Sequence, residues 1–207
     1  MTSNLLVKVC GMREAENIRQ VEALGIDYMG FIFYPKSPRY VAERPEYLPV
    51  SCKRIGVFVN AEEDFIEQKI SEFCLDGIQL HGSESAKQCR RLKDAFDGLV
   101  IKAVSIADEA DVVKARIYTD ACDALLFDTP CTGYGGSGKG FDLNLLTDAD
   151  FSACPFFLSG GIGLDSLGAL NRFHHPNWTG IDINSRFELS PGLKSPELIS
   201  RFLKGID

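Results

Sequence analysis

The sequence predicts an α/β fold built as one (β/α)8 barrel, and three observations carry this prediction. Apolar runs rich in branched and aromatic residues recur along the chain and fit strands buried on both faces. Each run ends on a polar or glycine residue, which is how such a barrel assembles an active site. Helical stretches alternate with the runs, and eight strand-like runs fall within 207 residues, near the lower end of the size range for this barrel. Six runs that show the pattern are LLVKVCG, YMGFIFYPKSPR, GIQLHG, ALLFDT, FFLSGG and TGIDINS.

The first strand and helix set the pattern. After LLVKVCG, the stretch REAENIRQVEALG places Ile18, Val21 and Leu24 on one helical face. It stops at Gly25, a residue suited to a helix C-terminus. A second strand over about Tyr28–Tyr34 then runs into a loop that contains prolines.

The next two helices follow the strands RIGVFVN and IQLHG. AEEDFIEQKISEFC carries acidic residues in its first turn, and its apolar face follows helical spacing. The residues on that face are Phe65, Ile66, Lys69, Ile70 and Phe73. SESAKQCRRLKDAF opens with Ser83 and Glu84 and is predicted to be helical to about Phe96.

The alternation continues to the end of the chain. VIKAVSI predicts a strand, DEADVVKARIYTDA a helix, and ALLFDT a strand that leads into the glycine-rich loop CTGYGGSGKGFD. FFLSGG and TGIDINS complete the strands, while LDSLGALNRF and SPELISRFLKGI supply helices. Since no proline- or serine-rich linker divides the chain, we expect one barrel domain over residues 1–207. A doubly wound sheet would usually need fewer βα units.

Composition narrows the class of protein. The chain has 22 basic and 29 acidic residues, a net charge of −7, which argues against a nucleic-acid partner and favours a small molecule. No apolar stretch approaches the roughly 18 residues that span a bilayer, so we expect no membrane association. Seven scattered cysteines fit neither a disulfide framework nor a zinc site. These features predict a soluble, cytoplasmic protein, either monomer or homodimer.

The last two strand ends predict a phosphate site. Barrels commonly bind phosphate between the loops that follow the seventh and eighth strands. Gly160 and Gly161 let the backbone approach an anion closely, and Asn184, Ser185 and Arg186 suit the start of a short helix. The alternative is an ordinary glycine turn followed by helix-capping residues.

The loop from Gly133 to Gly140 offers a competing interpretation, a nucleotide-binding P-loop. The spacing matches as far as Gly138 and Lys139, but Gly140 stands where a Ser or Thr must bind Mg²⁺. The loop also lies several residues beyond the strand end. We therefore favour a loop that moves over the barrel mouth, and expect neither metal nor cofactor.

Cys10 and Asp128 are the candidates for acid–base catalysis. Cys10 ends the first strand, and Asp128 closes the apolar run of the sixth. As a thiolate, Cys10 could accept a proton from carbon, but its ordinary pKa near 8.5 requires a nearby cation or a helix N-terminus. Desolvation would raise the pKa of Asp128 and let it donate a proton. A cysteine can also be a small buried hydrophobe, and an aspartate can cap a turn.

Three further side chains could orient a substrate. Arg39 lies in a loop stiffened by Pro35 and Pro38, and its planar fork matches a carboxylate. Gln79 and His81 end the fourth strand and should lie on the same side of it. No cluster of acidic metal ligands accompanies His81 in the sequence, which favours a hydrogen-bonding role over metal binding.

Several long motifs follow one another along nearly the whole chain: KVCGMRE, GFIFYPKSPRYV, IGVFVN, IQLHG, LLFD, FFLSGGI and DINSRFELSPGLK. In these motifs and their order the chain resembles the phosphoribosylanthranilate isomerase family of tryptophan biosynthesis. It implies a cofactor-free Amadori rearrangement of N-(5-phosphoribosyl)anthranilate to 1-(2-carboxyphenylamino)-1-deoxyribulose 5-phosphate. Asp128 would open the ribose ring, and Cys10 would then remove the C2 proton.

The resemblance also assigns the binding residues. Arg39 matches the residue that binds the anthranilate carboxylate, and Gln79 and His81 match a pair that lines the pocket. The phosphate end corresponds to Gly160, Gly161, Asp182, Asn184 and Ser185.

Two departures from the family pattern stand out. Ser185 is followed by Arg186 in place of a glycine, which would add a charge near the phosphate. Phe141, Asp142 and Leu143 replace the Phe-x-Trp that often follows the glycine-rich loop. A related phosphoribosyl isomerase of histidine biosynthesis and a non-catalytic phosphate-binding barrel are the alternatives. The first should use aspartates as both acid and base.

Overall fold

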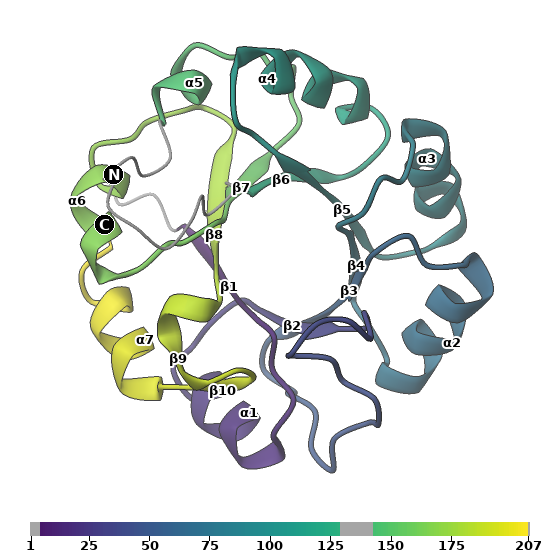
Figure 1. Cartoon of the computed structure of the whole chain (residues 1–207), viewed down its shortest axis with the longest axis vertical. Coiled ribbons are helices and arrows are strands. Elements are labelled where there is room, and N and C mark those ends of the chain that lie inside the picture. Colours follow the sequence, from purple (N-terminus) through teal and green to yellow (C-terminus); the bar gives the residue numbers. More distant parts are fainter. Residues whose placement is uncertain (1–4, 129–142, 207) are drawn as a thin grey trace.

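The computed structural model describes residues 5–128 and 143–206, and its centre is a closed barrel of parallel strands. Each strand pairs with the next along the chain, and β8 pairs back to β1, so the predicted fold class is confirmed (Figure 1). The strands are β1 (Leu6–Cys10), β2 (Tyr28–Ile32), β3 (Lys53–Phe58), β4 (Gly77–Leu80), β5 (Leu99–Ser105), β6 (Ala124–Asp128), β7 (Phe156–Leu158) and β8 (Trp178–Ile183).

The helices surround the strands as an outer ring (Figure 1). They are α1 (Ala15–Glu22), α2 (Glu63–Phe73), α3 (Ala86–Ala95), α4 (Glu109–Ala115), α5 (Asn144–Thr147), α6 (Leu167–Leu170) and α7 (Pro196–Leu203). A short antiparallel pair, β9 (Glu188–Ser190) and β10 (Leu193–Lys194), follows β8. No helix in the described ranges is both long and apolar enough to cross a membrane.

Capping residues fix where the helices begin, and one start differs from the prediction. α3 begins at Ala86, because the Ser85 side chain accepts from the Gln88 N–H while the Gln88 side chain accepts from the Ser85 N–H. Glu84, predicted to open this helix, therefore lies before it. α7 begins in a similar way, with Ser195 as its cap and Pro196 in its first turn.

The loop with prolines that was expected after the second strand is confirmed. No helix forms between β2 and β3, and the chain crosses residues 33–52 in turns and bends. Pro35, Pro38, Pro45 and Pro49 fall in this stretch, and proline inside a helix removes a hydrogen bond and clashes with the preceding turn. The prolines thus leave a loop long enough to carry Arg39 to the barrel mouth.

Strand alternation separates two layers of side chains. Outward-facing residues such as Val7 and Val9 of β1 join the large apolar layer between the strands and the helices. A second apolar cluster fills the barrel interior and comprises Ile55, Ile101, Ala103, Ala124, Leu126 and Phe157. Lys8 and Cys10 face inward by the same two-residue period, so the interior becomes polar toward the carboxyl ends of the strands.

Candidate active site

A cavity of about 290 Å³ opens at the carboxyl ends of the strands. It brings together all the predicted site residues except Arg39 and Arg186. Its lining comprises Cys10, Ile32, Val57, Gln79, His81, Asp128, Ser159, Gly160, Gly161, Ile162, Asp182, Asn184 and Ser185. The cavity thus joins residues from strands on opposite sides of the barrel.

Buried charges surround Cys10 at the end of β1. Lys8 lies two residues earlier on the same side of the strand and is completely buried. Its Nζ is 2.9 Å from Asp182 Oδ1 on β8, and Ser159 Oγ donates to Asp182 Oδ2 at 3.4 Å. The Cys10 sulfur and Lys8 Nζ both lie against Gly30 of β2, at 2.9 and 3.1 Å from where a Cβ would be. Only glycine leaves room for both groups.

Burial and charge act on Cys10 in opposite directions. Burial raises the pKa of the Cys10 thiol, while Lys8 and Lys194 lower it through their positive charge. Burial outweighs the two lysines, so the pKa is raised. Burial also raises the pKa of Asp182, in spite of its ion pair with Lys8. A thiolate at Cys10 requires a nearby cation, and two are present, Lys8 and Lys194. Burial nevertheless favours the neutral thiol.

Asp128 lies across the barrel from Cys10 and is bonded to His81. His81 Nε2 lies 3.2 Å from Asp128 Oδ2, and Gln79 Nε2 lies 3.3 Å from His81 Nδ1. With the Gln79 amide oriented so that Nε2 donates to Nδ1, the ring proton lies on Nε2 and faces Asp128. Gln79 Oε1 is a buried acceptor with no hydrogen-bond partner among the described residues. The expected shared orientation of Gln79 and His81 is confirmed.

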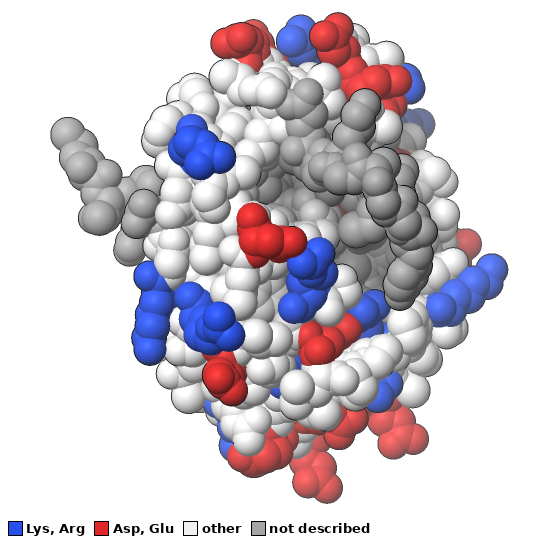
Figure 2. Space-filling view, turned by 60° about the vertical axis from the view of Figure 1, so that its left-hand side comes forward, with Lys and Arg blue, Asp and Glu red and all other residues white. Residues whose placement is uncertain are grey.

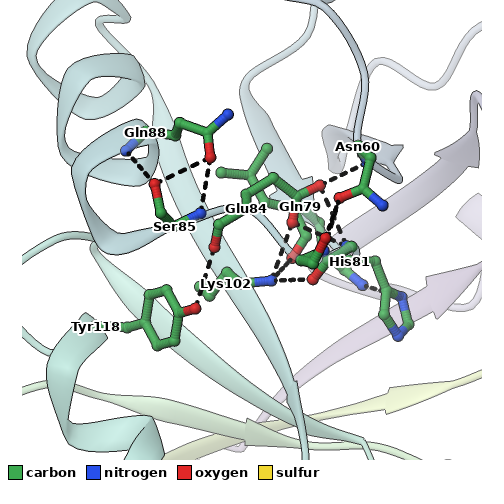
Figure 3. Close-up of polar contacts among 11 residues, drawn as sticks. Asn60, Gln79, His81, Glu84, Ser85, Gln88, Lys102 and Tyr118 are labelled. Atoms are coloured by element: carbon green, nitrogen blue, oxygen red, sulfur yellow. Dashed lines mark hydrogen bonds and ion pairs between the residues drawn. The ribbon is translucent and has the colours of Figure 1, made fainter.

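A buried ion pair holds the loop that carries His81 (Figure 3). Lys102 of β5 donates to the carbonyl of Leu80 at 3.1 Å, to that of Gly82 at 2.8 Å, and to Glu84 Oε2 at 3.0 Å. Glu84 also accepts from the N–H groups of Asn60 and Gly82. Burial alone would raise the pKa of Glu84, but the hydrogen bond from the Asn60 N–H and the charge of Lys102 lower it. The loop after β4 is thereby fixed on both sides of His81.

Arg39 lies beside this cavity rather than in its wall. Its Nε and Nη2 donate to the two carboxylate oxygens of Glu188, at 2.8 and 2.6 Å. The side chain packs over Gly11, where a Cβ would come within 2.7 Å of Arg39 Cδ. Gly11 has φ +80° and directly follows Cys10. The guanidinium therefore occupies the edge of the site next to Cys10.

Glycine backbone forms the opposite end of the cavity. Gly160 and Gly161 have φ of +86° and +62°, a left-handed conformation that other residues rarely adopt. With Ser185, they line the wall after β7 and β8. Arg186 points elsewhere: its side chain is 52% exposed, and Nη2 donates to Asp165 at 2.8 Å. A role for Arg186 in binding phosphate stays a prediction.

Four polar residues at this site were not predicted from the sequence: Lys8, Ser159, Glu188 and Lys194. A signal existed for Lys8, which precedes Cys10 by two residues in a run otherwise apolar. Ser159 stands one residue before Gly160 at a strand end. Glu188 and Lys194 lie in ELSPGLK after the last strand, where no pattern indicated a site.

Two other expectations concern metals and nucleotides. The proposed P-loop residues, Gly133 to Gly140, lie outside the described residues, as do Phe141 and Asp142. Within the described ranges, His, Cys, Asp and Glu side chains form no group of three or more suited to a metal ion.

Figure 2 shows basic and acidic side chains interspersed on the face that it presents, unlike the basic stripe of a nucleic-acid-binding protein.

A closed barrel with ionisable groups gathered at the carboxyl ends of its strands defines the class of α/β-barrel enzymes. The family model described as N-(5'-phosphoribosyl)anthranilate (PRA) isomerase matches residues 7–205. The chain belongs to this family, and it is an isomerase of tryptophan biosynthesis. The resemblance on which the sequence analysis relied is confirmed, as is the enzyme class.

Individual relatives agree over nearly their whole length. N-(5'-phosphoribosyl)anthranilate isomerase of Phocaeicola vulgatus is 54% identical and covers 96% of each chain. The crystal structure of phosphoribosyl anthranilate isomerase from Thermotoga maritima has a TM-score of 0.84 and 34% identity, covering 97% of this chain and 98% of the other. A further structure of such an isomerase, with TM-score 0.79, 31% identity and 97% coverage of each chain, is a complex with reduced 1-(o-carboxyphenylamino)-1-deoxyribulose 5-phosphate.

Proposed function

We propose that this isomerase converts N-(5'-phosphoribosyl)anthranilate to 1-(2-carboxyphenylamino)-1-deoxyribulose 5-phosphate, with Asp128 as general acid and Cys10 as general base. The observation that carries this proposal is that the two side chains line one cavity from opposite strands, β6 and β1. A substrate carbon between them would have an acid on one side and a base on the other, as aldose–ketose isomerisation requires.

Asp128 and Cys10 then each carry out one proton transfer. Asp128 donates a proton to the ribose ring oxygen, and the ring opens to an iminium ion. The Cys10 thiolate next removes the proton on C2, which gives an enolamine that tautomerises to the ketone. Lys8 and Lys194 support the thiolate by charge, while His81, whose Nε2 lies 3.2 Å from Asp128 Oδ2, stabilises the carboxylate that remains once Asp128 has given up its proton.

Opposite ends of the cavity would recognise the two anionic groups of the substrate. Gly160 and Gly161 offer a backbone that a phosphate can approach closely, with Asn184 and Ser185 nearby. Arg39 would bind the anthranilate carboxylate beside Cys10. The complex of the related isomerase with a reduced form of the product supports this substrate.

The domain organisation, the cellular compartment and the oligomeric state are also part of the proposal. We infer one barrel domain over residues 1–207, acting in the cytoplasm on a small phosphorylated substrate. The cysteines of the described ranges are free thiols, as in proteins of reducing compartments. Monomer or homodimer stays a prediction.

Substrate fluorescence lost during turnover tests the assigned roles. Cys10→Ser and Asp128→Asn should each lower kcat by about 10²- to 10⁴-fold, the usual contribution of a positioned acid or base. Cys74→Ser is the matched control, because Cys74 is exposed at the end of α2, and it should keep full activity.

The outcomes separate the alternatives. Near-wild-type turnover by either site variant would remove the role assigned to that residue. An inactive wild type that still binds the substrate would indicate a phosphate-binding barrel. A thiol at the base position already disfavours the isomerase of histidine biosynthesis, which should use two aspartates.

A further inference from the structure

Glu188 has no role in the acid–base chemistry, yet its carboxylate accepts four hydrogen bonds. It lies at the start of β9, directly after the turn that follows β8, and its side chain is 6% exposed. Oε1 accepts from Arg39 Nε at 2.8 Å, Lys194 Nζ at 2.7 Å and the Gly192 N–H at 3.0 Å. Oε2 accepts from Arg39 Nη2 at 2.6 Å. These four hydrogen bonds all come from groups of the protein itself.

Lys194 cancels the charge of Glu188 and anchors it. Lys194 is completely buried, and its Nζ also donates to Asn184 Oδ1 at 2.6 Å, in the wall of the cavity. Its backbone exchanges two hydrogen bonds with the Asn17 side chain of α1, at 2.8 and 2.9 Å. Arg39, Lys194 and Glu188 together carry a net charge of +1. Because Lys194 is completely buried, the positive group that a ligand can reach is Arg39, the more exposed of the two cations.

The bidentate contact also fixes how Arg39 is presented. Glu188 occupies the Nε/Nη2 edge of the guanidinium. On the other edge, Nη1 has no hydrogen-bond partner among the described residues, and a planar fork can bind a second carboxylate there. Gly11 permits the Arg39 side chain to lie close to the end of β1. A long, flexible side chain is thereby held in one orientation before the substrate arrives.

We propose that Glu188 is the positioning residue for recognition of the substrate carboxylate: it holds one edge of Arg39 so that the other edge binds that carboxylate. Lys194 keeps Glu188 from neutralising the site. This inference rests on the proposed function, because it requires Arg39 to bind the carboxylate of the substrate.

Two ligands that differ only in the carboxylate test the inference. One is the reduced 1-(o-carboxyphenylamino)-1-deoxyribulose 5-phosphate, and the other is the same compound with an unsubstituted phenyl ring. Titration calorimetry on the wild type should show a preference of about 30-fold for the carboxylated ligand, as for hydrogen bonds to a charged group. Glu188→Gln should reduce this preference roughly ten-fold and leave the Kd of the phenyl ligand unchanged. A merely structural role would weaken both ligands equally.

Three further variants complete the experiment. Glu14→Gln is the control, because it removes an exposed carboxylate near the same end of the barrel, and it should keep the full preference. Arg39→Met should abolish the preference. Glu188→Asp keeps the charge but not the reach, so an intermediate preference is expected, and this variant carries the test if Glu188→Gln does not fold.

Each result has a distinct meaning. Full preference in Glu188→Gln, or in a folded Glu188→Asp when the glutamine variant is unfolded, overturns the positioning role while Arg39→Met still supports the proposed function. Full preference in Arg39→Met overturns both, because Arg39 would then not bind the carboxylate. Loss of preference in both the Arg39 and Glu188 variants, with the phenyl ligand bound normally, supports the inference.

Discussion

The two sides of the cavity differ in how they hold an ionisable group. Cys10, Lys8 and Asp182 on β1 and β8 are buried. His81 and Asp128, on the opposite side, have side chains that are 35% and 29% exposed. Fixed charges act strongly where water is excluded and weakly where it enters. The base therefore depends on its neighbours, whereas the acid can exchange protons with solvent.

This difference suits the two proton transfers. The C2–H group is a weak acid, so the base benefits from a site without water in which lysines stabilise the thiolate. The acid must be reprotonated in each cycle, and partial exposure supplies that proton. Changes on the Cys10 side should consequently cost more activity than changes on the Asp128 side.

Among substitutions that leave Cys10 and Asp128 themselves in place, the largest effect should come from Gly30→Ala. A Cβ at this position would lie 2.9 Å from the Cys10 sulfur and 3.1 Å from both Lys8 Nζ and Cys10 Cα. The thiol must move, and a displacement of about 1 Å costs roughly 10²-fold in rate. Steady-state turnover measures the loss, with folding checked by the unfolding midpoint.

Gly168→Ala is the matched control. It lies in α6, and its nearest neighbour would be Arg172 Nη1 at 3.6 Å, so activity should not change. Full activity in Gly30→Ala would mean that the thiol tolerates displacement, and the contrast between the two sides would fail.

The barrel and the strand-end residues were predictable because both depend on local periodicity. Cys10, Gln79 and Asp128 each face inward near the end of a buried run, and parallel strands place such ends together. Asp182 was assigned only through the family resemblance. The phosphate-end glycines were predictable for the same reason. The inward-facing positions at the strand ends therefore predicted most of the residues that line the cavity.

Long-range pairing was beyond what local patterns contain. Lys8 and Asp182 meet across 174 positions of sequence, and Arg39 and Glu188 across 149. Nothing near Lys8 in the sequence shows that a carboxylate will neutralise it. The hairpin of β9 and β10, which brings Glu188 to Lys194, follows from loop geometry and not from a period.

An effect of intermediate size is expected for Lys8→Met. Burial raises the pKa of Cys10, and the Lys8 charge opposes that rise. Since thiolate is the active form, kcat/KM of the wild type should increase with pH through the neutral range. Removal of the Lys8 charge raises the thiol pKa further, and each unit of rise lowers the thiolate fraction about ten-fold below the pKa. The pH profile should shift to higher pH.

Two features make this test specific. The ratio of wild-type to variant kcat/KM should shrink toward alkaline pH, because both thiols ionise there. Asp182 would take up a proton when its partner is lost, since burial already raises its pKa. Lys69→Met removes another buried lysine, on α2 and paired with Glu72, and should leave the profile unchanged. An unshifted profile in Lys8→Met would contradict the role of fixed charge.

The smallest effect is expected for His81→Gln. Glutamine keeps an N–H donor but cannot take up and release a proton, so reprotonation of Asp128 would depend on solvent alone. Because the pair is partly exposed, water can replace the imidazole, and kcat should fall only about five-fold with KM nearly constant. His174→Gln, at an exposed position, is the control and should match the wild type. A loss as large as that of Asp128→Asn would show that His81 is indispensable to the acid. The Asp128 side would then depend on its neighbours as strictly as the Cys10 side does.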